Sequence, residues 1–281
     1  MKMNPLGRTG IMVSRLCLGT MTFGQQNSQE EAHPQLDMAV DHGVNFIDTA
    51  EAYSFPGRAE TQGRSEEIIG NWMQAGGNRD KMVVATKITG PSNDRSHIRD
   101  GQLNFSRKQV AEAVDLSLKR LKTDVIDLYQ THWPERKANY FGKLDYAHVE
   151  DDDTTPMEEQ LDALADQVKA GKVRAIGVSN ETAWGLMTFL GIADRMGLPR
   201  LASIQNPFNL ICRQFEIGLA EPAIREEVGL LAYSPLAFGA LTGKYLGGQL
   251  PDGSRHKLCP KFMRYFKPNG VRATGAYVAL A

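Results

Sequence analysis

Short apolar runs alternate with longer amphipathic segments along most of the chain. The runs at residues 44–47 and 125–130 are mostly apolar and of strand length, which is typical of strands buried on both faces of a parallel sheet. Between such runs, apolar residues recur at helical spacing, as at Val110, Val114 and Leu118. The pattern predicts strands at residues 16–20, 44–47, 83–87, 125–130, 173–180, 201–206 and 230–233, and helices at 28–43, from 65, from 106, at 156–170, 181–196, 215–228 and 271–281.

Local signals fix several ends of these elements. Residues 1–18 are predicted to form a β-hairpin, because residues 7–10 read Gly-Arg-Thr-Gly and supply a turn. Ser28, followed three residues later by Glu31, resembles a capping box. Ser106 is the expected cap of the helix that carries Val110.

Polar side chains follow one predicted strand after another. Asp48 ends a buried run, and because a buried charge is costly unless it is paired, it needs a cation. Lys87, at the end of the next run, can supply that cation. A (β/α)8 barrel brings such strand ends together on one face, whereas an open doubly wound sheet would spread most of them apart. No Gly-x-Gly-x-x-Gly follows an early strand, which argues against a dinucleotide-binding Rossmann domain. The strand-end residues are Asp48, Lys87, His132, Asn180, Gln205 and Tyr233.

The strand count is one short of a complete barrel. Seven runs are found where eight are needed, and the last helical pattern, at residues 271–281, stops without a glycine or a polar tail. We therefore expect one α/β domain, residues 1–281, with the fold of a (β/α)8 TIM barrel, an N-terminal β-hairpin and a missing last β/α unit. The missing part would be absent, supplied by another chain or replaced.

Composition narrows the class of protein. A formal net charge of −1 gives no electrostatic case for nucleic acid or an anionic membrane, and no apolar run approaches the ~20 residues of a membrane span. Three widely spaced cysteines suggest neither a disulfide framework nor a zinc site. The acidic run at residues 150–153 is interpreted as a solvated loop or helix-entry cluster rather than a metal site. These absences favour a reduced, cytoplasmic protein without a bound metal.

Seven motifs in order along the chain resemble the aldo-keto reductase superfamily, and within it the bacterial Tas-type members. The likeness extends from about residue 5 to the end, except for the last βα unit, which in the family helps to bind the adenosine 2′-phosphate, and a C-terminal loop that shapes the substrate pocket. The motifs lie at residues 18–24, 48–53, 85–87, 129–134, 176–180, 204–207 and 231–245.

The resemblance implies a catalytic tetrad of Asp48, Tyr53, Lys87 and His132. Its chemistry is physically reasonable, because reducing a carbonyl builds negative charge on the oxygen that a proton donor must quench. A free phenol titrates near ~10, and a neighbouring ammonium, here that of Lys87, favours the phenolate. Asp48 would keep Lys87 charged and in place, and His132 would orient the carbonyl.

The resemblance also implies NADPH as the cofactor. Ser179, Asn180 and Gln205 would hydrogen-bond the nicotinamide carboxamide, and Tyr233 would stack on its ring. The glycine-rich segment from Ser234 to Lys244 is expected to hold the pyrophosphate with backbone amides and the Lys244 ammonium. Apolar walls for the substrate are expected from Phe23, Tyr53 and Trp133. The full set of expected cofactor-binding residues is Thr20, Ser179, Asn180, Gln205, Tyr233, Ser234, Leu236, Phe238, Gly239, Leu241, Thr242, Gly243 and Lys244.

Three hypotheses for function follow. The first is an NADPH-dependent reductase of small aldehydes or ketones with Tyr53 as general acid. The second is a cofactor-binding regulatory protein akin to potassium-channel β-subunits, with the loop at residues 133–155 as a partner surface. The third is an inactive truncated fragment. The sequence fixes neither the substrate nor the oligomeric state.

Overall fold

A seven-stranded parallel sheet forms the centre of the protein, as seen in a computed structural model that describes residues 1–150 and 152–281. The strands stand in the order of the sequence, from β3 to β9, and every neighbouring pair is parallel. All seven predicted strands are confirmed. They are β3 (Leu18–Gly19), β4 (Phe46–Asp48), β5 (Val83–Ile88), β6 (Ile126–Thr131), β7 (Val173–Ser179), β8 (Leu201–Pro207) and β9 (Gly229–Tyr233).

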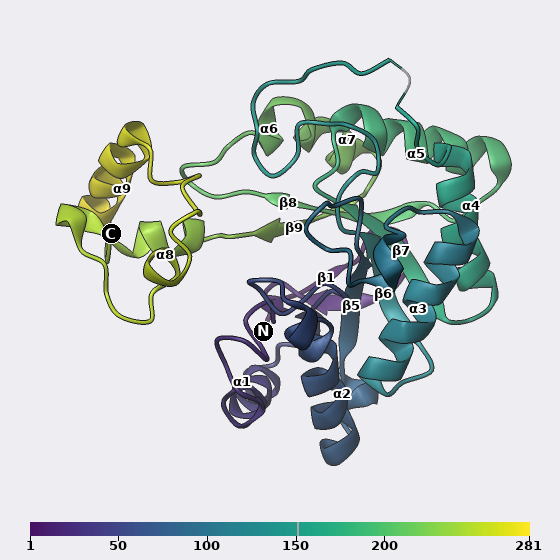
Figure 1. Ribbon diagram of the computed structural model, residues 1–281, viewed down its shortest axis with the longest axis horizontal. Helices are drawn as coiled ribbons and strands as arrows, with labels where there is room; N and C mark the ends of the chain where they lie inside the picture. Colours follow the sequence, from purple (N-terminus) through teal and green to yellow (C-terminus); the bar gives the residue numbers. More distant parts are fainter. Residues whose placement is uncertain (151) are drawn as a thin grey trace.

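Each connection between neighbouring strands carries a helix. The sheet curls with helices α2 to α5 along its outer face (Figure 1), which is the arrangement of a (β/α)8 fold. Within the described residues, no eighth strand pairs with β3 or β9, which form the two edges of the sheet. The helices are α1 (Gln29–Asp41), α2 (Arg64–Gly76), α3 (Arg107–Leu121), α4 (Met157–Lys169), α5 (Ala183–Met196), α6 (Phe215–Gly218), α7 (Ala220–Arg225), α8 (Arg255–Leu258) and α9 (Pro268–Leu280).

Of the two predicted helix caps, the capping box at Ser28 is present and the side-chain cap at Ser106 is not. Ser28 precedes α1, and the reciprocal bonds of a capping box with Glu31 are both present. Ser106 precedes α3 as predicted, but its side chain does not cap the helix. The Ser106 hydroxyl instead donates to Oδ1 of Asn104 at 2.7 Å, because a short amide side chain two residues away competes for it.

The predicted N-terminal hairpin consists of β1 (Met3–Pro5) and β2 (Met12–Ser14), paired antiparallel. Its buried side chains Leu6, Ile11 and Val13 pack against the amino-terminal part of the central strands in one apolar cluster. A Cβ at Gly7 would come within 3.0 Å of the Ala202 Cα, and Gly7 also has a φ of +54°. The hairpin therefore lies against β8 at a position that only glycine fits.

The main core lies between the sheet and its helices. Ile47, Val84 and Ile204 project from the strands into a cluster that also holds Trp72 and Val114 from the helices. Fully burying each such side chain stabilises the fold by about 1.5–3 kcal/mol. The core thereby fixes the strands whose carboxyl ends carry the polar residues.

The segment after β9 forms a separate group of short elements. It contains α8 and α9, and lies beyond the ends of β8 and β9, away from helices α2 to α5 (Figure 1). The predicted helix at residues 271–281 corresponds to α9, which begins earlier, at Pro268. None of the described helices combines the length and apolarity required to cross a lipid bilayer. Of the acidic run at residues 150–153, Asp151 lies outside the described residues.

Candidate active site

A cavity of about 870 Å³ opens at the carboxyl ends of the strands. Its wall includes Asp48, Tyr53 and His132 from the predicted tetrad. Lys87, the fourth member, lies behind this wall and is fully buried. The structure therefore brings the four predicted side chains to one place, at the end of the fold where (β/α)8 enzymes keep their active sites.

Asp48 and Lys87 form a buried ion pair. Their distance, Nζ to Oδ2, is 2.6 Å, and Lys87 also donates to the backbone oxygen of Thr49 at 2.7 Å. The pair arises from register: Asp48 ends β4 beside Ala85 of β5, so the Lys87 side chain, two residues on, reaches back to it. Burial is the largest single effect and lowers the pKa of Lys87, but the charge and hydrogen bond of Asp48, together with Tyr53 and Cys17, outweigh it and the pKa is raised. Lys87 is therefore held as an ammonium ion.

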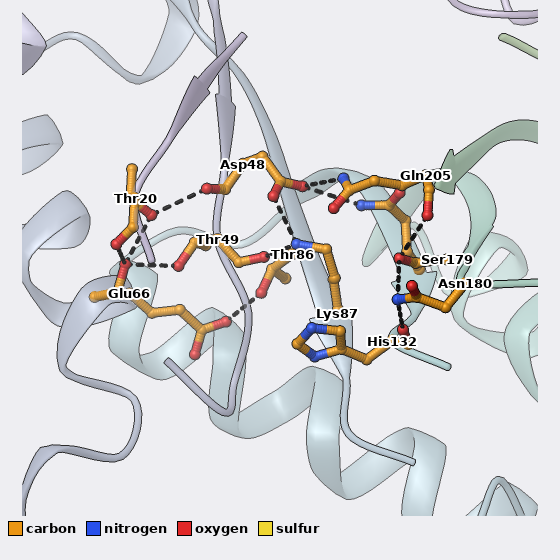
Figure 2. A network of polar contacts seen from close by, with 12 residues as sticks. Thr20, Asp48, Thr49, Glu66, Thr86, Lys87, His132, Ser179, Asn180 and Gln205 are labelled. Carbon is orange, nitrogen blue, oxygen red and sulfur yellow. Dashed lines mark hydrogen bonds and ion pairs between the residues drawn. The ribbon is translucent and has the colours of Figure 1, made fainter. Parts of the chain in front are cut away.

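The other oxygen of the Asp48 carboxylate accepts two amide groups. Nε2 of Gln205 donates to Oδ1 at 2.8 Å, and Nε2 of Gln130 donates to the same atom at 3.3 Å. Figure 2 shows the carboxylate between Lys87 on one side and Gln205 on the other. Three donors on one buried carboxylate compensate for its desolvation.

Tyr53 stands in front of the ion pair, facing the cavity. Nζ of Lys87 lies 5.1 Å from the centre of the Tyr53 ring. The sequence argument expected Lys87 to favour the phenolate, but burial outweighs that attraction and the pKa of Tyr53 is raised from its ordinary value of 10.0. At neutral pH the phenol therefore keeps its proton, as a general acid must before it acts.

His132 adjoins Tyr53 as a neutral imidazole. Its ring meets the Tyr53 ring edge-on, with centroids 5.5 Å apart. Burial, together with the positive charges of Lys87 and Arg95, lowers the pKa of His132 well below 6.5. Its Nδ1 is buried without a hydrogen-bond partner among the described residues. The uncharged ring has one nitrogen that donates a hydrogen bond and one that accepts a hydrogen bond, and the tautomer decides which nitrogen does which.

Thr20 borders the cavity, but its hydroxyl points into the fold. It donates to the Asp48 backbone oxygen at 3.0 Å and lies 2.7 Å from the hydroxyl of Ser65. The hydroxyl of Ser65 in turn lies 2.9 Å from the hydroxyl of Thr49. This hydroxyl cluster joins α2 to the ends of β3 and β4. The side-chain oxygen of Thr20 therefore stabilises the structure around the site.

The expected carboxamide-binding residues are already bonded to one another. Asn180 donates to the His132 backbone oxygen at 2.9 Å and accepts from the hydroxyl of Tyr233 at 2.7 Å. The Ser179 hydroxyl donates to the Gln205 backbone oxygen at 2.8 Å. These residues line the cavity, but a ligand amide would have to share or replace these bonds. Burial raises the pKa of Tyr233.

The segment from Ser234 to Lys244 only partly faces the cavity. Seven of its residues line the wall: Ser234, Pro235, Leu236, Phe238, Gly239, Thr242 and Lys244. Leu241 and Gly243 do not; Leu241 packs against Tyr265 and its neighbours, and Gly243 faces Val278. The amides of Ala237, Gly239, Leu241 and Gly243 already donate to carbonyls of the same segment. Lys244 is thus a more available anion-binding group than these four amides.

The expected apolar walls are partly correct. Tyr53 and Trp133 line the cavity, together with Phe55, Phe141 and Phe262. Phe23 does not; it is 1% exposed and packs in the main core. Phe23 lies directly before Gly24 in the turn between β3 and α1.

Residues 15–280 match the model of the aldo/keto reductase family. The chain belongs to the aldo/keto reductase family. Membership makes it an oxidoreductase, and it agrees with the sheet and the buried Lys87–Asp48 pair described above.

Individual relatives support the assignment. The chain is 50% identical to the protein tas of Escherichia coli over 282 aligned positions, which cover all of this chain and 81% of that protein. It is 37% identical to the uncharacterized oxidoreductase YrpG of Bacillus subtilis, over 86% of this chain and 68% of that protein. A probable voltage-gated potassium channel subunit beta of Arabidopsis thaliana is 34% identical, over 92% of this chain and 71% of its own length.

Three cations in the cavity wall of this aldo/keto reductase escaped the sequence argument. Arg95 lies in the polar loop after β5, and Arg255 and Arg264 lie in the segment after β9. Arg264 packs against the ring of Tyr233, and both Arg255 and Arg264 pack against Phe238. None of the three directly follows a strand, so the expectation that functional side chains lie at strand ends did not identify them.

Proposed function

We propose that this protein reduces the carbonyl group of small aldehydes or ketones with NADPH, with Tyr53 as the general acid. The observation that carries the proposal is the buried Lys87–Asp48 pair directly behind the Tyr53 ring. A fully buried lysine is costly unless it is paired. A buried ammonium beside a protonated phenol can stabilise the phenolate that remains when the phenol gives up its proton. The arrangement therefore suits proton transfer from Tyr53 to a ligand in the cavity.

When bound, the nicotinamide would supply a hydride to the carbonyl carbon. As negative charge grows on the carbonyl oxygen, Tyr53 gives it the phenolic proton, and the Lys87 ammonium stabilises the phenolate that remains. Asp48 keeps Lys87 charged and fixed. The neutral His132 can donate a hydrogen bond to the same oxygen and orient it. General acid catalysis of this kind contributes about 10²–10⁴-fold to the rate.

The cavity suits a dinucleotide whose phosphates lie against the segment after β9. Its volume of about 870 Å³ is within the usual range for ligand sites. Lys244, Arg255 and Arg264 supply three positive charges on that wall, and anionic phosphates are their natural counter-ions. Ser179, Asn180 and Gln205 would hold the carboxamide, and Tyr233 would lie against the nicotinamide ring. The polar side chains of these residues line the cavity, which supports this placement of the nicotinamide.

The test is the consumption of NADPH in the presence of a panel of aldehydes, with Tyr53→Phe as the decisive variant. We expect turnover by the wild type, a loss of about 10²–10⁴-fold in kcat for Tyr53→Phe, and unchanged NADPH affinity by fluorescence titration. Tyr277→Phe is the matched control, because Tyr277 is not among the residues that line the cavity. Absence of turnover by folded wild type, or full turnover by Tyr53→Phe, would refute the proposal. A parallel NADH titration decides the cofactor preference.

A second candidate function is a cofactor-binding regulatory subunit. It is favoured by the likeness to the potassium channel subunit named above and by an exposed apolar group, Leu144, Tyr146 and Val149, in the loop after β6. It predicts cofactor binding with negligible turnover, and co-purification of a partner that is lost when these three side chains are replaced by serine.

A further inference from the structure

Arg95 occupies the substrate side of the cavity without a protein counter-ion. Its guanidinium lies over the Trp133 ring, 5.9 Å from the ring centroid. Among the described residues, no hydrogen bond or ion pair involves its side chain, and the neighbouring Asp94 is exposed. Burial lowers the pKa of Arg95 from its ordinary value, although the negative form of Tyr53 and the neighbouring Asp94 favour its charged form. A partly buried guanidinium with five unused donors is costly unless an anion binds it.

No carboxylate in the described part of the cavity wall is free to bind Arg95, so the anion must come from a ligand. Asp48 is the one carboxylate among the described residues in the cavity wall, and it is already neutralised by Lys87. The other spare cations, Arg255 and Arg264, come from the segment after β9. Arg95 comes instead from the loop after β5. It therefore belongs to a different part of the chain from the cations assigned to the cofactor phosphates.

Neighbouring groups position the Arg95 guanidinium. Nε1 of Trp133 donates to the Pro91 backbone oxygen at 3.0 Å, which ties the indole to the loop that carries Arg95. A Cβ at Gly57 would lie 2.7 Å from Nη1 of Arg95, so the glycine allows the guanidinium to approach the backbone. The rings of Tyr53, His132 and Trp133 follow one another at 5.5 and 4.8 Å. They form a row that leads from the proposed acid toward Arg95.

We propose that Arg95 binds a carboxylate carried by the carbonyl substrate, so that the preferred substrates are oxo-acids. This rests on the proposed reductase function, whose reacting carbonyl lies between Tyr53 and His132. The substrate's carbon chain would extend along the Trp133 face, and its carboxylate would meet the guanidinium in a bidentate pair. Arg95 thereby determines specificity through a contact distant from the reacting atoms.

The test compares 4-oxobutanoate with its methyl ester, and 4-formylbenzoate with its methyl ester, as substrates at saturating NADPH. Because a hydrogen-bonded charge pair is worth about tenfold to a hundredfold in affinity, we expect wild type to prefer each acid in kcat/KM by that factor. Arg95→Gln should abolish the preference for each acid over its ester. Arg95→Lys should recover part of it. Gly57→Ala should reduce it by displacing the guanidinium, and Arg58→Gln, at an exposed arginine on the same loop as Gly57, should have no effect.

A second measurement separates this proposal from the reductase function. Benzoate and benzamide are titrated by calorimetry into wild type and Arg95→Gln, which requires no turnover. Benzoate binding that is stronger than benzamide binding, and that is lost in Arg95→Gln, supports the carboxylate site even if no aldehyde is reduced. Equal reduction of acids and esters by wild type, or a preference that survives Arg95→Gln, overturns the site and leaves the reductase proposal standing. Benzoate binding that is absent or unaffected by Arg95→Gln also overturns the site.

Discussion

Glu51 and Arg99 form a buried ion pair, with Nη2 of Arg99 3.1 Å from Oε1 of Glu51. Glu51 lies between Asp48 and Tyr53, and its carboxylate also accepts the backbone amide of Thr89, just after β5. Arg99 adds a bond to the Thr89 oxygen at 3.1 Å. The pair therefore joins the segment that carries Tyr53 to the strand that carries Lys87, and it fixes how the two groups face each other.

Replacing Glu51 should weaken catalysis through position rather than through contact. Glu51→Gln keeps the shape of the side chain but leaves Arg99 buried without its counter-ion, which costs about 3–5 kcal/mol. We expect kcat to fall by about tenfold to a hundredfold because Tyr53 loses its fixed geometry, with NADPH affinity unchanged. Urea unfolding and steady-state kinetics on the folded protein measure the two effects.

The control for this prediction is Glu221→Gln. Its ion pair with Arg225 is exposed on both sides, so stability and kcat should change little. If Glu51→Gln lowers stability but leaves kcat of the folded protein intact, the pair has only a structural role.

The Lys87–Asp48 pair should be strongly coupled in stability. Asp48→Asn leaves a buried ammonium, and Lys87→Met leaves a buried carboxylate held by two amides. Each single change should destabilise the fold by about 3–5 kcal/mol, and the double variant by clearly less than the sum. Urea unfolding of the four proteins gives the coupling energy. Strict additivity would mean that the two charges do not depend on each other.

Acidification should destabilise the protein through His132. Its pKa is lowered in the folded state, so the unfolded state takes up the proton more readily. The stability from keeping His132 neutral is complete above pH 6.5 and is lost as the pH falls from 6.5 toward the folded-state pKa. One proton changes stability by at most ~1.4 kcal/mol per pH unit. The unfolding free energy of wild type should therefore fall more steeply below pH 6.5 than that of His132→Asn, and parallel curves would contradict this.

Helices α2 and α3 should tolerate no side chain at Gly70. A Cβ there would overlap the Arg120 carbonyl oxygen and lie 2.8 Å from the carbonyl carbon of Leu121. Because these atoms belong to the backbone, Gly70→Ala should cost about 1–3 kcal/mol by forcing the helices apart. Gly191→Ala, in α5 with no atom near its Cβ position, should instead stabilise by about 0.5–1 kcal/mol. Thermal unfolding of both variants checks the difference in sign.

The strands and three members of the tetrad were predictable because they depend on short-range pattern, whereas Tyr53 and the roles of the four residues came from the resemblance to the family. Asp48, Lys87 and His132 each follow a buried apolar run, and parallel strands bring their carboxyl ends to one edge. The pairing of Asp48 with Lys87 follows from the cost of burying either charge alone. These inferences needed only the order of strands, which the helical connections fix.

Other features depend on three-dimensional contacts that no local pattern reports. Arg95 lies in a loop rich in polar residues, where an arginine is normally solvated, and only the folded chain brings it to Trp133. The direction of the Tyr53 pKa depends on the balance between burial and the charge of Lys87, which requires the actual depth of the ring. Ser106 has the right position for a cap, yet Asn104 takes its hydroxyl.

The carboxylate of Asp48 holds Lys87 with one oxygen and Gln205 with the other. If Gln205 holds the nicotinamide carboxamide as proposed, a substitution there that alters cofactor binding also removes a donor from this carboxylate. Cofactor binding and the setting of Lys87 behind Tyr53 would then be coupled, and changing one would require compensation in the other.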